Sequence, residues 1–287
     1  MEATIKLAKK YLHKADAIFI TSGAGMSVDS GLPDYRSNLG IIANLNKQGY
    51  TYNDLADPKA FLKNAEYSWG WYAKHIQDYL EAKPHQGYEL IKQFVDNKNL
   101  EYFIFTSNVD CMWKKCGFDI NKIIEYHGSL DYLQSLSKDG PVWPIDMDEI
   151  KNIKYDSKTY KCDPNTIPIS KYDGNYARPN VCFFNDNNYF NTTRFDEVDK
   201  IFSEWYIKIA KQNKRVVVLE IGAGIIVPTV REMSESFIID HLINVDIEEN
   251  KEDYAKLIRI NPVYMDVPEG HISIPLTGLE ALKLLLL

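Results

Sequence analysis

The sequence predicts an α/β fold in which a doubly wound parallel sheet carries a smaller inserted lid domain. Short apolar runs typical of buried parallel strands recur at 15–21, 102–106, 123–126, 216–221 and 242–245. Helical patterns lie between several of these runs, at 86–96, 192–212 and 250–260. Two segments, 40–84 and 131–177, fit the alternation poorly and are interpreted as insertions. Strands that alternate with helices are typical of a parallel sheet covered on both faces.

The expected elements follow in order along the chain. Residues 5–13 place apolar side chains at helical spacing, so we expect an amphipathic helix there. The run at 15–21 ends in a glycine-rich turn, which is typical of a strand in a parallel sheet. The first insertion contains a helical segment near 58–80, and the second is polar and rich in turns. We expect the sheet to be formed by about 1–39, 85–130 and 178–287, and the lid by about 40–84 and 131–177.

Composition excludes several classes of protein. The 287 residues are 45% hydrophobic and 25% charged, as in an ordinary globular protein with a sizeable core. The cysteines Cys111, Cys116, Cys162 and Cys182 form no CxxC pair, which excludes a four-cysteine zinc ribbon. A net charge of −7 without a run of Lys or Arg argues against a nucleic-acid partner. The apolar stretch 281–287 is too short to span a bilayer, and the N-terminus lacks a signal-peptide pattern, so we expect a cytoplasmic protein.

A glycine-rich loop, SGAGMS, follows the first predicted strand at 22–27. Glycines at this place let the backbone approach a pyrophosphate, whose charge is met by backbone N–H groups. Gly23, Ala24 and Gly25 are therefore candidate cofactor-binding residues, and the Ser27 hydroxyl can bond a phosphate. Val28 stands where a GxGxxG fingerprint needs glycine, so a tight turn between strand and helix is the alternative.

The loop continues into SGLPDYR at 30–36, and here the sequence resembles the sirtuins, NAD-consuming protein deacylases and ADP-ribosyltransferases. Residues 23–36 depart from their GAGxSxxSGIPDFR hallmark only at Leu32 and Tyr35. The resemblance implies a Rossmann-like sheet, one sirtuin-like catalytic domain over 1–287, and NAD as co-substrate. It also implies that Asp34 and Arg36 pair beside the nicotinamide ribose, and that Tyr35 shields the reactive ribose carbon.

Two further sirtuin-like motifs follow the strand at 102–106. TSNVD at 106–110 resembles TQNID, which implies that Asp110 binds the nicotinamide carboxamide, with Asn108 and Ser107 on the ribose side. An Asx turn at a strand end is the alternative for Asn108 and Asp110. EYHG at 125–128 resembles E-x-H-G. It makes His127 the candidate general base, because a histidine can take a proton from a ribose hydroxyl near neutral pH. His127 and Asn108 are thus the candidate catalytic residues.

The segment RPNVCFFND at 178–186 resembles the family's RPxVVxFGE strand, which pairs with the backbone of an acyl-peptide substrate. The resemblance makes Val181, Phe184 and Asp186 candidate substrate-binding residues. Asn185 replaces a glycine of the family pattern, and Cys182 replaces a valine. Cys182 is interpreted as a small strand hydrophobe rather than a nucleophile.

A second glycine loop, GAG at 222–224, follows the run at 216–221. It resembles the sirtuin loop that contacts the NAD ribose and phosphate, which makes Gly222 and Ala223 candidate cofactor-binding residues. LINVD at 242–246 resembles the later strand that holds the adenine ribose. Asn244 and Asp246 are the candidates there.

The sequence also departs from most sirtuins. Their zinc ribbon needs CxxC pairs between the HG and RP motifs, but residues 134–178 contain only Cys162, so no metal is expected. The segment YSWGWY at 67–72, Trp113 after NVD, and LEIGAG at 219–224 resemble the divergent bacterial class M sirtuins, which favour protein ADP-ribosylation. That group often lacks the catalytic histidine, whereas this chain keeps His127.

The leading hypothesis is an NAD-dependent protein lysine deacylase (deacetylase) that releases nicotinamide and O-acyl-ADP-ribose. Its expected partners are NAD and an acylated or ADP-ribosylatable protein, with no nucleic acid and no membrane. A protein ADP-ribosyltransferase and an NAD glycohydrolase are alternatives that use the same NAD site. A catalytically silent NAD-sensing module is the alternative from a different class.

Overall fold

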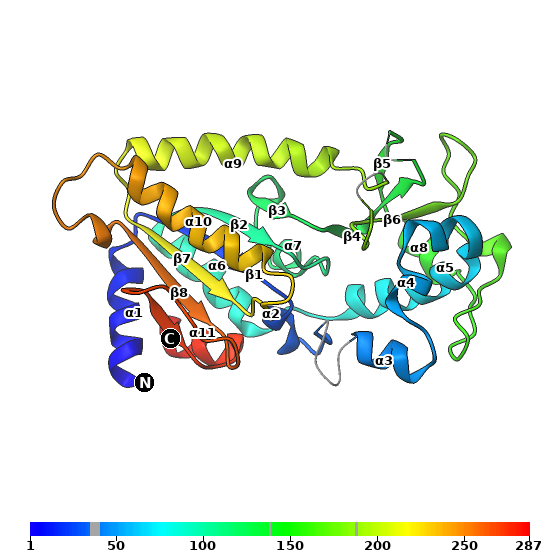
Figure 1. Ribbon diagram of the computed structural model, residues 1–287, viewed down its shortest axis with the longest axis horizontal. Helices are drawn as coiled ribbons and strands as arrows, with labels where there is room; N and C mark the ends of the chain where they lie inside the picture. The colour runs from blue at the N-terminus through cyan, green and yellow to red at the C-terminus, as the bar shows by residue number, and fades with distance from the viewer. Residues whose placement is uncertain (35–40, 138, 187–188) are drawn as a thin grey trace.

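The computed structural model describes residues 1–34, 41–137, 139–186 and 189–287 and contains two sheets (Figure 1). The larger has six strands in the order β3-β2-β1-β7-β8-β9, and every neighbouring pair is parallel. These strands are β1 (Ala17–Ser22), β2 (Glu101–Thr106), β3 (Ile123–Glu125), β7 (Val216–Ile221), β8 (Ala255–Ile260) and β9 (Ile272–Ile274). The parallel sheet confirms the predicted α/β class, and it confirms the strands expected near 15–21, 102–106, 123–126 and 216–221.

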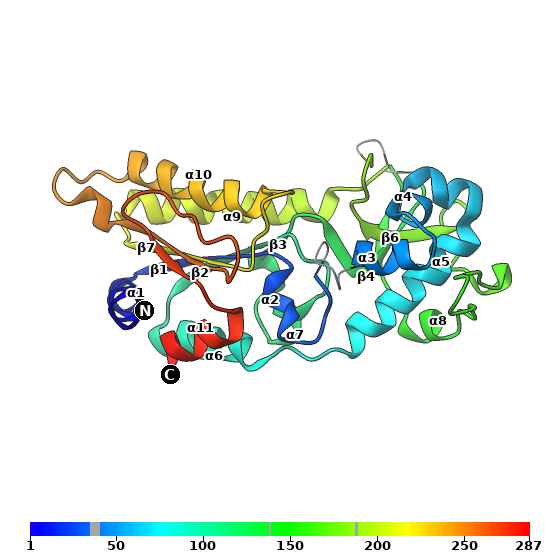
Figure 2. The ribbon, with the colours of Figure 1, turned by 60° about the horizontal axis from the view of Figure 1, so that its bottom comes forward.

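Helices cover both faces of the larger sheet because its strands are apolar on both sides. Along β1, Phe19 packs into one cluster with Trp205 and Phe237, whereas Ile18 and Ile20 pack into the other. Helices α9 (Thr193–Lys211) and α10 (Thr229–Asn244) cover the first face. Helices α1 (Glu2–Lys14), α6 (Gln86–Lys98) and α11 (Gly278–Leu286) cover the second, as Figure 2 shows.

The small domain contains an antiparallel sheet of order β5-β4-β6 and lies at one end of the molecule in both ribbon views (Figures 1 and 2). Its strands are β4 (Gly128–Ser135), β5 (Val142–Pro144) and β6 (Ala177–Val181), and its helices are α3 (Ile41–Lys47), α4 (Tyr52–Leu55), α5 (Pro58–Glu81) and α8 (Met147–Lys151). The Trp69 indole N–H donates to the carbonyl oxygen of Ala177 at 2.8 Å, which ties α5 to β6. Residues 178–181, expected in the larger sheet, therefore belong to the small one.

Two sequence predictions near the C-terminus are wrong. The run at 242–245 is not a strand, because α10 continues to Asn244 and keeps its apolar face on the sheet. The helix expected at 250–260 is a short 3-10 turn, η3 (Lys251–Asp253), followed by β8. Every residue of β8 is buried, so the strand lacks the alternation of polar and apolar residues that marks a half-exposed strand. In the part of the chain that the structure describes, no helix is long and apolar enough to cross a membrane.

Candidate functional site

The two glycine loops meet in direct backbone contact where β1 and β7 end. The Gly23 N–H donates to the carbonyl oxygen of Ile221, and the Gly25 N–H donates to that of Gly222, both at 3.0 Å. Gly222 has a φ of +65°, and a Cβ there would lie 2.3 Å from the Met26 nitrogen. A side chain at Gly222 is therefore excluded by both conformation and space. The loops form a bare-backbone cradle of the kind that pyrophosphate binding requires.

Ser27 is the point where the first glycine loop meets the segment after β2. Its hydroxyl donates to an Asp110 carboxylate oxygen at 2.5 Å. The Ser27 hydroxyl oxygen accepts from the Asn108 side-chain amide at 3.2 Å and lies 3.0 Å from the Tyr88 hydroxyl. A serine hydroxyl has one proton to donate and two lone pairs to accept, so these partners saturate it. Ser27 therefore organises the site from within, and the expected contact of its hydroxyl with a phosphate stays a prediction.

Asn108 and Asp110 are held together at the end of β2. The Asn108 side-chain amide also donates to the carbonyl oxygen of Gly23 at 3.0 Å. The second Asp110 oxygen accepts from the Met112 N–H at 3.1 Å and so starts helix α7 (Met112–Lys115). Burial raises the pKa of Asp110, although its hydrogen bonds from Ser27 and Met112 oppose that shift. The expected neighbours Asn108 and Asp110 are thus brought against the first glycine loop.

His127 follows β3 and faces the segment after β2. Its Nδ1 lies 3.2 Å from the Ser107 carbonyl oxygen, which can only accept a hydrogen bond. In the neutral ring Nδ1 therefore carries the proton and Nε2 carries the lone pair that can accept another. Burial lowers the pKa of His127, so the neutral form dominates at pH 7. The backbone carbonyl of Ser107 thus selects the tautomer that a general base needs.

A buried cluster of possible metal ligands lies close to this site. Cys111, Glu125 and Asp131 bring one ligand atom each within 4.8 Å of one another. The ammonium of Lys114 already lies 2.7 Å from Asp131 and 3.0 Å from Glu125. Burial raises the pKa of Cys111 to about 12, so the thiol keeps its proton. These residues do not fit zinc, which binds thiolates and repels an ammonium.

The predicted substrate residues separate in the structure. Val181 ends β6 opposite Gly128, and Phe184 is 38% exposed with its ring 5.2 Å from that of Tyr52 in an edge contact. Asp186 is 1% exposed and pairs with both terminal nitrogens of Arg178 at 2.5 and 2.8 Å. It is therefore a structural partner of Arg178, and the expectation that it binds substrate stays a prediction.

Asn244 and Asp246 do not reach the site. Asn244 ends α10, where its amide donates to the Tyr206 hydroxyl, and Asp246 follows it. Helix α10 runs back along the sheet from the end of β7 (Figure 1), and the Asp246 N–H donates to the side-chain oxygen of Asn213, shortly before β7 begins, so both residues lie away from the glycine loops. The expectation that they contact the cofactor therefore gains no support from these positions and stays a prediction.

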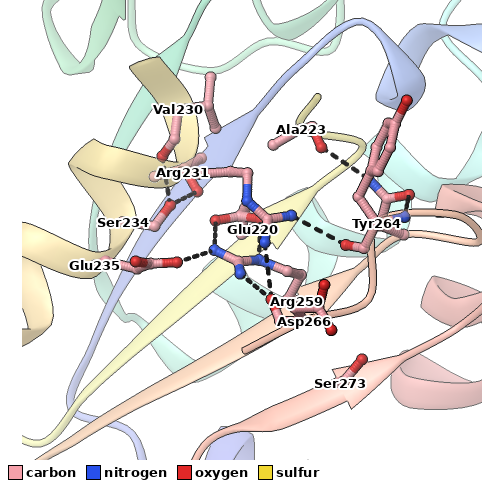
Figure 3. A network of polar contacts seen from close by, with 12 residues as sticks. Glu220, Ala223, Val230, Arg231, Ser234, Glu235, Arg259, Tyr264, Asp266 and Ser273 are labelled. Carbon is pink, nitrogen blue, oxygen red and sulfur yellow. Dashed lines mark hydrogen bonds and ion pairs between the residues drawn. The ribbon is translucent and has the colours of Figure 1, made fainter. Parts of the chain in front are cut away.

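Asn261 is the residue that the sequence analysis missed. It follows β8, and its amide donates to the carbonyl oxygen of Ala223 at 2.8 Å (Figure 3 labels Ala223 and Tyr264). Its side-chain oxygen accepts from the N–H groups of Val263 and Tyr264, each at 2.9 Å. An Ile-Asn pair occurs both at 243–244, within the LINVD segment, and at 260–261, directly after an apolar run. The second pair could therefore have been chosen from the sequence.

A buried ionic network fixes the loop that follows Asn261. Arg259 donates to Glu220 at 2.5 and 2.8 Å, to Glu235 at 2.7 Å and to the backbone of Asp266, as Figure 3 shows. Arg231 from α10 donates to the backbone of the same loop. The loop after β8 is therefore held to β7 and α10 by Arg259 and Arg231.

The remaining predicted residues are placed as follows. Ala24 and Gly25 are half-buried, and Ala223 is fully buried beside the first loop. Asp34 is half-buried at the end of the described N-terminal segment. Tyr35 and Arg36 lie outside the described residues.

The comparisons with known proteins agree with the resemblance that these motifs carry. A family model described as the Sir2 family matches residues 23–209. The "Probable bifunctional ADP-ribose hydrolase/ADP-ribosyltransferase" of Fusarium oxysporum f. sp. cubense is 26% identical over 275 residues, which cover 90% of this chain and 42% of that protein. The "NAD-dependent protein deacylase" of Deinococcus radiodurans is 28% identical over 200 residues, which cover 68% of this chain and 72% of that protein. This chain thus spans less than half of the Fusarium protein.

Solved structures share the fold. The crystal structure of a Sir2 homologue in complex with NAD superposes with a TM-score of 0.68 at 21% identity, covering 98% of this chain and 91% of that one. A Sir2 homologue in complex with ADP-ribose superposes equally well, with a TM-score of 0.68 at 20% identity, and covers 98% of this chain and 94% of that one. The Rossmann-like arrangement of the larger sheet is therefore shared with these structures.

Proposed function

Since the chain belongs to the Sir2 family, we propose that it is an NAD-dependent protein lysine deacylase with His127 as its general base. In this reaction the acyl oxygen of a modified lysine displaces nicotinamide from the ribose of NAD. A ribose hydroxyl then attacks the acyl carbon, and addition of one water molecule releases the free lysine amine and O-acyl-ADP-ribose. The NAD-bound fold neighbour and the Deinococcus deacylase support NAD as the co-substrate. The bare-backbone cradle of Gly23, Gly25 and Gly222 is consistent with a dinucleotide phosphate.

The hydrogen bond from His127 to Ser107 is the observation that carries the proposal. It fixes the proton on Nδ1 and leaves the Nε2 lone pair for a ribose hydroxyl. The lowered pKa of His127 keeps that lone pair unprotonated at neutral pH. General-base catalysis of this kind contributes roughly 100-fold or more to rate.

Other residues of the site take complementary roles in this proposal. Asn108 and Asp110 lie on the nicotinamide side, where a carboxylate accepts from a carboxamide N–H group. Ser27 holds Asp110 in place through its 2.5 Å hydrogen bond. Val181 and the exposed ring of Phe184 would line the path of an extended peptide. The cytoplasmic location expected from the sequence stays a prediction.

Protein ADP-ribosylation is the second candidate function. The Fusarium relative carries that activity in its name and aligns with 90% of this chain. The same NAD site would serve, with a protein nucleophile in place of the acyl oxygen. In that reaction no ribose hydroxyl attacks an acyl group, so His127 has no such proton to accept. Loss of His127 should therefore lower deacylation more than ADP-ribosylation.

Product analysis by mass spectrometry tests the proposal. The protein is incubated with NAD and a panel of acyl-lysine peptides, and wild type is compared with His127→Ala and with His13→Ala. His13 is an exposed histidine on α1 and serves as the matched control. We expect deacylated peptide and O-acyl-ADP-ribose from wild type and His13→Ala, and roughly 100-fold less from His127→Ala.

Three other product patterns would contradict the proposal. ADP-ribose attached to protein in the absence of an acyl group would identify a transferase. Free ADP-ribose with unchanged peptide would identify a glycohydrolase. NAD binding without nicotinamide release would identify a silent sensing module.

A further inference from the structure

A cluster of charged side chains surrounds the backbone segment that carries His127. We name it the Lys114 cluster, and its members are Lys114, Glu125, Ser129, Asp131 and Arg194. They come from α7, β3, β4 and the start of α9. Elements of the larger sheet and of the small domain therefore meet in one group of side chains.

Lys114 is the hub of this cluster. Its ammonium lies 3.0 Å from a Glu125 oxygen and 3.0 Å from the Ser129 hydroxyl. It also lies 2.8 and 2.7 Å from the two oxygens of Asp131. Arg194 adds a contact of 3.0 Å to Glu125. The cluster contains two cations and two carboxylates and so has no net charge. A partly buried ionic group needs such pairing to offset the loss of hydration.

The hub is shielded from solvent and stays charged. The side chains of Lys114 and Glu125 are only 13% and 7% exposed. Burial on its own would lower the pKa of Lys114, but the carboxylates of Glu125 and Asp131 raise it well above the usual value. The Lys114 ammonium therefore stays charged at physiological pH and keeps its ion pairs with Glu125 and Asp131. Screened contacts on the surface would contribute much less.

His127 lies between two of the groups that Lys114 binds. Glu125 comes two residues before it and Ser129 two residues after it. The turn between them is tight, since Gly128 has a φ of +78° and a Cβ there would lie 2.0 Å from the Asn180 carbonyl oxygen. A chain held on both sides of such a turn keeps the imidazole in one place.

Lys114 is also joined to the opposite side of the site. It lies in α7, whose first N–H, that of Met112, is held by Asp110 at 3.1 Å. One side chain thus connects the helix fixed by Asp110 with the turn that carries His127. A metal ion bound by Cys111, Glu125 and Asp131 would have to displace the Lys114 ammonium, and the connection between α7 and the His127 turn would then be lost.

We propose that Lys114 is a positioning residue for His127, an inference that rests on the proposed function because it takes His127 to be the general base. Its ammonium fixes the segment 125–131 relative to α7, and so fixes the imidazole relative to Asn108 and Asp110. Lys114 acts through Glu125, Ser129 and Asp131 rather than on the substrate.

Two readouts on the full chain separate positioning from general structural damage. Exchange of labelled nicotinamide into NAD, measured with an acyl peptide, reports the displacement step, which comes before proton transfer to His127. Formation of deacylated peptide reports both steps. For Lys114→Met we expect kcat for product to fall roughly tenfold or more. Nicotinamide exchange and the KM for NAD should stay within about twofold of wild type, as in His127→Ala.

The neighbouring lysine provides the matched control. Lys115 lies in the same turn of α7, but its ammonium binds the carbonyl oxygens of Tyr79 and Ala82 at the end of α5. Lys115→Met should therefore leave the ratio of product to exchange unchanged. If Lys114→Met does not fold, Asp131→Asn removes one anchor of the cluster and should lower the same ratio more weakly. A fall in both readouts together, or in neither, would overturn the inference.

An NMR titration measures the pKa of the His127 ring without substrate. It therefore tests positioning by Lys114 independently of whether the protein is a deacylase. The signal is identified by its loss in His127→Ala. In wild type it should titrate below 6.5, and in Lys114→Met its midpoint should move up toward 6.5, because a loosened ring is less buried and burial is what lowers its pKa. An unmoved midpoint contradicts positioning even in an active deacylase. A moved midpoint in a protein that forms no deacylated peptide supports positioning and contradicts the proposed function.

Discussion

The Ser27 hydroxyl donates a 2.5 Å hydrogen bond to the carboxylate of Asp110, although 83 positions separate the two residues in the chain. The bond joins the first glycine loop to the end of β2 in a buried setting. It also opposes the effect of burial on the pKa of Asp110. Ser27 therefore favours the ionised form of Asp110 and holds one of its two carboxylate oxygens in place.

Replacing Ser27 by alanine should weaken the nicotinamide side of the site. The pKa of Asp110 should rise further, because burial then acts with less opposition. We expect nicotinamide exchange to fall roughly tenfold, as for the loss of a hydrogen bond to a charged group. Ser203→Ala, at an exposed position of α9, is the control. Equal exchange rates in the two variants would contradict this role for Ser27.

Asn261 and Asn244 offer a direct comparison at the cofactor site. Asn261 binds the carbonyl oxygen of Ala223 in the second glycine loop, whereas Asn244 lies at the far end of α10. Truncation of a buried polar partner costs about 1–3 kcal/mol. We expect Asn261→Ala to raise the KM for NAD roughly tenfold, and Asn244→Ala to leave it unchanged. The reverse order would restore the contact that the sequence predicted for Asn244.

The buried ion pair between Arg178 and Asp186 should stabilise the segment 178–186. Asp186→Asn leaves the Arg178 guanidinium buried without its counter-charge, which costs about 3–5 kcal/mol of unfolding free energy. The exposed pair Lys74–Asp78 is the control, with side chains 42% and 51% exposed. Asp78→Asn should cost less than about 1 kcal/mol. Denaturant unfolding of both variants measures the difference, and equal losses would contradict it.

His75 should make stability depend on pH. Burial lowers its pKa from 6.5 to about 4, so the unfolded chain binds its proton more readily than the folded one. The stabilising contribution is therefore complete above 6.5 and is lost as the pH falls toward 4. The loss amounts to roughly 3 kcal/mol. Unfolding free energies of wild type and His75→Gln at pH 7 and pH 4.5 isolate this group from the other buried histidines. Parallel pH dependences in both proteins would contradict the prediction.

Local patterns in the sequence predicted the parts of the fold that depend on neighbouring residues. The strand at 17–22 and the glycine loop after it follow from an apolar run and the residues that end it. The motif residues Asn108 and His127 come close together because parallel strands end at one edge of the sheet. Their positions could therefore be inferred without a structure.

Features that depend on distant partners could not be predicted. Strand β8 contains Arg259, and its burial requires Glu220, which lies 39 positions away. The sequence does not show that Arg259 has a buried partner. An arginine within an apolar run therefore suggests the exposed side of an amphipathic helix rather than a buried strand. The Ser27 contact with Asp110 is a second long-range contact of this kind. The pairing of Asp186 with Arg178 spans only eight positions, but the sequence does not show that the two side chains are buried together.

The product balance of the wild-type protein tests the central claim most directly. With NAD and an acyl-lysine peptide, the nicotinamide released, the deacylated peptide and the O-acyl-ADP-ribose are quantified in one reaction by mass spectrometry. A deacylase predicts equal amounts of all three products. Nicotinamide released with unchanged peptide and free or protein-bound ADP-ribose would contradict it.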